Sequence, residues 1–264
     1  MSRFLDHREA GKIFHDFEKH KDRYLIIHYS CESFFDTNGA TPRITAIAVK
    51  SPSSGQTDLF AVHKAAELMQ IQTEDIFEKY KEVERRMLDD FFTFVQGHTD
   101  KIWIHWNMRD SNFGFKALEK RYRVLGQVPA IIPDQSKLDL AILFRKYYGK
   151  SYIGDPHIKS LMDHNDIHVK DFMSGKDEAD AFNNHDFVRL SFSCAGKVNL
   201  FDKFLTRAID NELKTKSSFQ DRYGNIPLGI YNCANESTWG KILFWIANLI
   251  IGGLVGGFIG KFFS

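Results

Sequence analysis

The densest group of side chains that could do chemistry lies just after the apolar stretch 101–106. It contains Asn107, Arg109 and Asp110. An arginine beside a helix N-terminus forms an anion site, because the guanidinium and the free N–H groups both favour negative charge. Asn and Asp are also common turn and N-cap residues, which gives part of this group a structural explanation. We expect these three residues to bind a phosphate or a nucleotide.

The elements that must position this group alternate between strands and helices. Apolar and β-branched stretches predict strands, periodic stretches predict helices, and Gly, Pro and Ser separate them. The strands are expected at 24–35, 43–51, 57–63 and 101–106, the helices at 73–98, 112–126 and 185–213, and a strand that passes into a helix at 137–149. This order predicts an α/β fold whose mixed sheet carries helices on its faces.

In such sheets, binding sites form beyond the carboxyl ends of neighbouring strands. Ser30, Cys31 and Glu32 end the first expected strand, and the Asn107–Asp110 group follows the fourth. Together with the order of the elements, these residues resemble the ribonuclease-H-like 3′–5′ exonucleases of the DEDD type over about residues 22–210. The resemblance implies a ribonuclease-H-like sheet. It also implies that Glu32, Asp110 and Asp180 hold Mg²⁺ or Mn²⁺ as catalytic metal ligands.

The sequence departs from that family's pattern in three respects. Ser30 stands where the family has a metal-binding Asp, and Gly175 and Lys176 stand where it has a general base. Asp110 also lies one residue closer to Asn107 than usual. Because two-metal hydrolysis needs several carboxylates, these changes favour a non-catalytic sensing or binding domain over an active nuclease.

A long apolar run lies near the end of the chain. Residues 242–260 carry no charge and are bracketed by Lys241 and Lys261. This length predicts a transmembrane helix over 241–263, and Gly252, Gly256 and Gly260 predict its self-association through a glycine zipper. The alternative is a buried or docked helix. The N-terminus has no signal peptide, so a tail-anchored layout with the soluble domain in the cytoplasm is expected.

The predicted organisation is a soluble α/β domain at 1–213, a juxtamembrane linker at 214–240 and the transmembrane helix. The 264 residues include 35 Lys and Arg against 34 Asp and Glu, a net charge of +1, so no global charge excess attracts nucleic acid or anionic lipid. The three cysteines, Cys31, Cys194 and Cys233, fit no metal or disulfide pattern. Their spacing favours a reducing compartment.

Three functions are compatible with these observations. The first is a membrane-anchored, non-catalytic sensing or binding domain whose self-associating helix makes it a membrane-acting effector. The second is a membrane-tethered, metal-dependent 3′–5′ exonuclease. The third is a scaffold that recruits a protein partner. The expected partners are accordingly a lipid bilayer, a second copy of the chain, a nucleotide or nucleic acid, and a protein.

Overall fold

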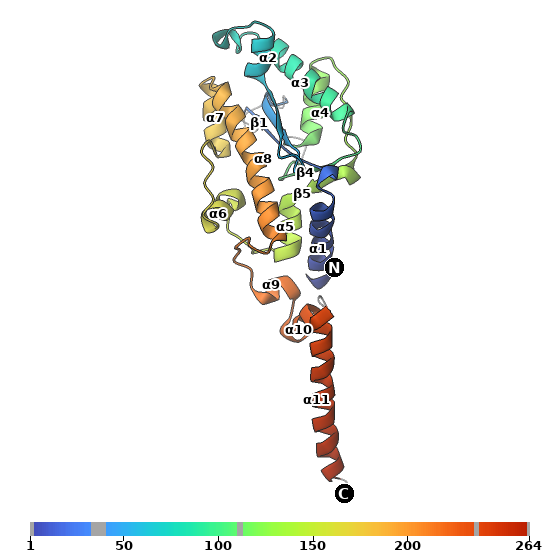
Figure 1. Cartoon of the computed structure of the whole chain (residues 1–264). Coiled ribbons are helices and arrows are strands. Elements are labelled where there is room, and N and C mark those ends of the chain that lie inside the picture. The colour runs from blue at the N-terminus through green and yellow to red at the C-terminus, as the bar shows by residue number, and fades with distance from the viewer. Residues whose placement is uncertain (1–2, 33–40, 110–112, 235–237, 263–264) are drawn as a thin grey trace. The chain divides into compact units, whose positions relative to one another are not determined.

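The computed structural model describes residues 3–32, 41–109, 113–234 and 238–262, without the side chains of 226–228, 233 and 254–262. Its contacts group the chain into two units (Figure 1). The larger one, the sheet unit, comprises Ile13–Leu143 and Met162–Leu213. The other, the terminal unit, comprises the N-terminal residues up to Lys12, Phe144–Leu161 and the chain from Lys214 onward.

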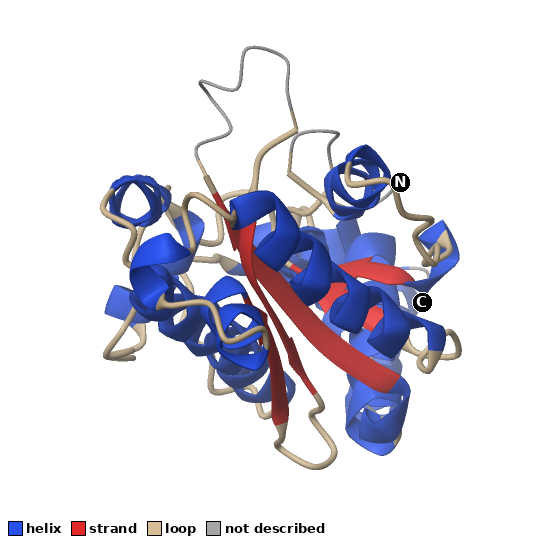
Figure 2. Ribbon diagram, turned by 90° about the horizontal axis from the view of Figure 1, so that it is seen from above, coloured by secondary structure: helices blue, strands red, loops and turns tan. Residues whose placement is uncertain are grey.

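The sheet unit is built on a five-stranded mixed sheet. Its strands are β1 (Tyr24–Cys31), β2 (Ile44–Lys50), β3 (Thr57–Ala61), β4 (Ile102–His105) and β5 (Lys137–Asp139), in the order β3-β2-β1-β4-β5. The first three strands pair antiparallel, whereas β4 and β5 continue the sheet parallel to β1. All residues of β1 are buried, which requires cover on both faces. Figure 2 shows that cover as helices on the two sides of the sheet.

Helix α1 (Arg3–Lys19) precedes the first strand, and the other described helices follow β3 along the chain. These are α2 (Val62–Leu68), α3 (Tyr80–Gln96), α4 (Phe115–Val124), α5 (Leu140–Tyr148), α6 (His157–His164), α7 (Gly175–Asn183), α8 (Phe187–Ile209), α9 (Phe219–Tyr223), α10 (Ile226–Ala234) and α11 (Thr238–Phe262). The mixed sheet flanked by helices agrees with the expected α/β class.

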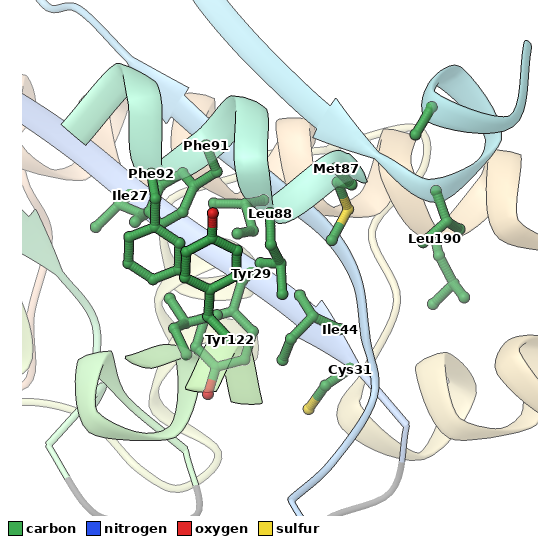
Figure 3. Close-up of a cluster of buried hydrophobic side chains, with 14 of the residues drawn as sticks. Ile27, Tyr29, Cys31, Ile44, Met87, Leu88, Phe91, Phe92, Tyr122 and Leu190 are labelled. Carbon is green, nitrogen blue, oxygen red and sulfur yellow. The ribbon is translucent and has the colours of Figure 1, made fainter. Parts of the chain in front are cut away.

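The two faces of β1 take up different partners because its side chains alternate between them. Ile27, Tyr29 and Cys31 belong to the main hydrophobic cluster, where they lie beneath Met87 and Phe91 of α3 (Figure 3). His28 and Ser30 point to the opposite face, toward α7 and α8. The carboxyl end of β1 therefore presents apolar groups on one face and polar groups on the other.

Part of the terminal unit is held by side chains of α1 that bind the carboxyl end of α5. The Arg3 guanidinium donates to the carbonyl oxygens of Lys146 (2.5 Å), Tyr147 (2.8 Å) and Asp221. These bonds satisfy carbonyls that a helix leaves unpaired at its end. Gly149 follows with a φ of +100°, and a Cβ there would lie 2.8 Å from the Asp221 carbonyl oxygen. This close approach requires glycine.

No helix in the described part of the chain is long and apolar enough to cross a membrane. For the described residues, the predicted transmembrane helix at 241–263, the tail-anchored layout and the membrane localisation are therefore wrong. Gly252 is exposed, and Gly256 and Gly260 lie outside the described side chains.

Candidate functional site

A buried polar cluster lies at the carboxyl end of β1, on the face covered by α7 and α8. The carboxylate oxygen Oε1 of Glu178 accepts hydrogen bonds from the hydroxyls of Ser30 (3.1 Å) and Ser193 (2.9 Å). The Lys197 ammonium lies 2.7 Å from the same oxygen. Strand β1, helix α7 and helix α8 each supply a member, so three separate segments converge on one carboxylate.

The charges of this cluster are removed from solvent. Glu178 is 8% exposed and Lys197 5% exposed. A buried charge is tolerated only when it is paired and hydrogen-bonded, and here the ammonium and two hydroxyls meet that requirement. Ser193 is itself fixed, because its hydroxyl oxygen accepts the backbone N–H of Met173 at 3.3 Å. The Glu178–Lys197 pair is thus a neutral, preorganised unit.

The start of α7 decides which of its carboxylates faces this cluster. Ser174 and Asp177 form a capping box, in which the Ser174 hydroxyl accepts the N–H of Asp177 and the Asp177 carboxylate accepts the N–H of Ser174. Because the capping box fixes the start of the helix at Ser174, Glu178 and Phe182 face inward. Asp180, the predicted metal ligand, lies on the exposed side.

His28 lies two residues before Ser30 on the same face of β1. Neither of its ring nitrogens has a hydrogen-bond partner among the described residues. Burial lowers the pKa of His28 well below its usual value, and the nearby Lys197 charge lowers it further. The imidazole is therefore neutral. Its ring packs edge-on against Phe201 at 5.7 Å.

The cysteines near this cluster are protonated. Burial raises the pKa of Cys31 strongly and that of Cys194 to about 12, and the Glu178 charge raises both further. The Cys194 thiol donates to the His28 carbonyl oxygen at 3.2 Å. A thiolate nucleophile is absent from this part of the described structure, because only the deprotonated form of cysteine reacts.

The structure places Glu32 in an ion pair with Arg43. Carboxylate oxygen Oε1 of Glu32 accepts the backbone N–H of Arg43 at 2.7 Å, and Oε2 accepts its side-chain Nε–H at 2.7 Å. The guanidinium of Arg43 also lies over the rings of Phe77, Tyr80 and Phe182, with its central carbon 4.7 to 5.3 Å from their centroids. Both oxygens of Glu32 are thus engaged by Arg43.

The predicted catalytic set of Glu32, Asp110 and Asp180 has two members in the described chain. Glu32 is held by Arg43, and Asp180 is exposed on α7. Asp110 lies outside the described residues. Within them, no group of three or more His, Cys, Asp or Glu side chains is placed to hold a metal ion.

A second polar group lies at the carboxyl ends of β4 and β5. His105 and Asp139 are the last residues of the two strands and are paired in register. Asp139 is buried, and its Oδ1 accepts the N–H of Ala141 at 2.9 Å. The Arg109 guanidinium reaches Asp139 Oδ2 and the side-chain oxygen of Asn107, both at 2.8 Å. The predicted ligand-binding residues Asn107 and Arg109 are thus brought together.

The conformation of the chain between β4 and Arg109 is tightly defined. Asn107 has a φ of +54°, a left-handed conformation that asparagine tolerates better than most residues. The backbone N–H of Met108 donates to Nδ1 of His105 at 3.2 Å. Burial lowers the pKa of His105 to about 4, against a smaller opposing effect of Asp139. His105 is therefore neutral at pH 7 and serves as an acceptor for the turn.

The residues that sequence reasoning missed are Glu178, Lys197 and Asp139. Helical spacing could have found the first two. Glu178 shares a face with Ala181 and Phe182, and Lys197 lies on the stripe that also carries Cys194 and Phe201. A charged residue on an apolar stripe needs a buried partner. Asp139 directly precedes α5, a position at which an aspartate is expected as an N-cap.

No known family model, no curated protein and no solved structure matches this chain. Nothing in these comparisons identifies an exonuclease domain.

Proposed function

We propose that the sheet unit is a non-catalytic binding domain for a phosphate-bearing ligand, a nucleotide or a single-stranded nucleic acid. The observation that carries this proposal is the pairing of Glu178 with Lys197 at the carboxyl end of β1. The proposal treats the domain as a relative of the exonucleases that the sequence resembles, one in which a side-chain cation stands in place of a catalytic metal.

The electrostatics of the cluster support the loss of catalysis. Two-metal hydrolysis needs carboxylates that together offset the charge of two divalent ions. Here Ser30 is neutral, Lys197 already neutralises Glu178, and Arg43 neutralises Glu32. In the wild type, a divalent ion would have to displace a buried ammonium in order to bind here.

Arg109 supports the ligand class. Its side chain is half exposed, and Asp139 and Asn107 hold it in one orientation. A guanidinium carries five N–H donors, and the contacts through Nε and Nη2 leave donors for a phosphate. Because Asp139 offsets part of the charge, we expect modest affinity that weakens as the salt concentration rises.

The test combines cleavage and binding measurements on the full-length protein. Single-stranded DNA and RNA are incubated with the protein and Mg²⁺ or Mn²⁺, and thermal unfolding is followed across a panel of nucleotides. The variants are Glu178→Ala for cleavage and Arg109→Ala for binding. Arg123→Ala is a matched control, since Arg123 is also half exposed and paired with a carboxylate, that of Glu119.

We expect no metal-dependent cleavage by the wild type. We also expect stabilisation by at least one nucleotide, which Arg109→Ala abolishes and Arg123→Ala retains. Cleavage that disappears in Glu178→Ala would establish the nuclease instead. Equal nucleotide stabilisation in wild type and Arg109→Ala would reject the assigned ligand site.

A further inference from the structure

The buried cluster around Glu178 has the composition of a cation site. A single carboxylate oxygen receives the Ser30 hydroxyl, the Ser193 hydroxyl and the Lys197 ammonium. Hydroxyl oxygens keep lone pairs that can turn toward a cation, and carboxylate oxygen is a preferred ligand of hard metal ions. The carboxylate of Glu178 and the two hydroxyls that share its oxygen with the ammonium can therefore act as cation ligands.

His28 is a buried polar side chain that lies two residues before Ser30. Its imidazole is 7% exposed and has no hydrogen-bond partner among the described residues, which costs free energy in a folded protein. It lies on the same face of β1 as Ser30. An imidazole nitrogen with a free lone pair can bind a metal ion, so His28 adds a candidate ligand on this face of the strand.

Another buried acid–base pair of the sheet unit lacks these properties. Glu84 is fully buried, and its Oε1 accepts the backbone N–H of Ile44 at 2.6 Å and the Nε–H of Arg121 at 2.9 Å. Neither donor can bind a cation through a lone pair. Glu84 is therefore saturated by N–H groups, and the Glu178 cluster differs from it in its oxygen-rich surroundings.

We propose that Glu178, Ser30 and Ser193 form a cation-binding site that the chain fills with its own Lys197 ammonium. Shortening Lys197 opens this site to an external cation. The metal ions that fit are the hard ions Mn²⁺ and Mg²⁺. A small primary ammonium is the closest mimic of the lost group. The proposal shares with the proposed function the role of Lys197 as counter-ion. Its readout is cation uptake by a variant, so each can fail without the other.

The experiment uses the full-length protein as wild type, Lys197→Ala, Glu178→Gln, and Lys197→Ala combined with Glu178→Gln. Lys203→Ala is the matched control, because Lys203 lies on the exposed side of the same helix. Binding of Mn²⁺ is measured from the loss of its free electron paramagnetic resonance signal. Thermal unfolding is measured with MnCl₂, ethylammonium chloride or tetramethylammonium chloride, the last of which has no N–H donor.

Lys197→Ala should bind one Mn²⁺ per chain and should be stabilised by Mn²⁺ and by ethylammonium. Wild type, Lys203→Ala and the double variant should show neither effect, and tetramethylammonium should stabilise none of them. If Lys197→Ala does not fold in buffer alone, refolding with Mn²⁺ or ethylammonium should recover it.

Three results would overturn the proposal. The first is a Lys197→Ala protein that takes up no Mn²⁺ and gains no stability from ethylammonium, or that refolds with neither. The second is equal Mn²⁺ binding by Lys197→Ala and the double variant. The third is one-to-one Mn²⁺ binding by wild type that Glu178→Gln removes, because the ammonium would then not fill the site.

Discussion

At the scale of single residues, the free energy of unfolding should depend on whether one member of the Glu178–Lys197 pair is lost or both are. Lys197→Met removes the ammonium but retains most of the volume of the side chain, so the carboxylate stays buried without a counter-charge. We expect the free energy of unfolding to fall by about 3–5 kcal/mol. Urea denaturation monitored by circular dichroism measures this loss.

The double variant Lys197→Met with Glu178→Gln separates charge from packing in the same experiment. Replacing a buried ion pair by neutral groups of similar size is often close to neutral in stability. We therefore expect the double variant to recover most of the loss. If it is as unstable as Lys197→Met alone, the lysine contributes through its packing and the ion pair contributes little.

His105 should impose a pH dependence on stability. Burial lowers its pKa from 6.5 to about 4, so the unfolded chain binds a proton more tightly than the folded one between these values. The free energy of unfolding should then rise with pH from about 4 to 6.5 and level off above that window. Urea denaturation at a series of pH values measures the slope.

The matched variant is His105→Asn, whose side-chain oxygen can still accept the N–H of Met108. Subtracting its pH profile from that of wild type isolates the contribution of the imidazole. We expect the difference to favour wild type increasingly as the pH rises from 4 to 6.5. A difference that does not change with pH would mean that His105 titrates alike in the folded and unfolded states.

Residue types alone identified part of the candidate site. Arg109 and Asn107 were found because guanidinium and amide groups after a strand are conspicuous. The resemblance to the exonuclease family selected Asp180 as the carboxylate of helix α7. The capping box at Ser174 instead turns Glu178 inward. The choice between two carboxylates on one helix depends on where that helix begins. Lys197 was missed because its partner lies on another helix.

At the scale of secondary structure, the strands were predictable and several helices were not. The expected strands at 43–51 and 101–106 contain β2 and β4, because β-branched and aromatic residues there are bounded by turn residues. Helix α2 was missed, since Val62 and His63 read as the end of a strand. Helix α1 is charged along its length, and its weak apolar pattern concealed it.

The antiparallel pair of β1 and β2 is closed by Glu32 and Arg43, which hold together the two chain segments at one end of that pair. Arg43→Lys keeps the charge and the backbone N–H that Oε1 of Glu32 accepts. It loses the planar guanidinium that lies over three aromatic rings and donates to Oε2. We expect a loss of about 1–2 kcal/mol in the free energy of unfolding. Urea denaturation at neutral pH measures it.

Arg86→Lys is the control for this substitution. Arg86 forms an exposed ion pair with Asp90 one helical turn away. Such pairs contribute little, so the change should stay within about 0.5 kcal/mol of wild type. Equal effects of the two substitutions would show that the rings around Arg43 add nothing specific.

At the scale of the whole chain, the near-zero net charge hides an uneven distribution of apolar groups. The sheet unit buries most of its apolar side chains, whereas the described part of α11 exposes many large ones. They include Trp239, Leu243, Trp245, Leu249, Ile250 and Ile251. The sequence predicted self-association of this helix from glycine spacing alone, and these exposed side chains supply an additional physical reason for it.

We therefore expect the full-length protein to associate through α11. A monomer has a mass of 30.5 kDa, and size-exclusion chromatography with light scattering should give a larger value for wild type. Introducing charge with Leu243→Lys and Leu249→Lys should lower that mass, because burying an ammonium in an apolar contact is unfavourable. Leu68→Lys is the control, since Leu68 is an equally exposed leucine on α2. An identical mass for wild type and the α11 double variant would show that this helix does not mediate association.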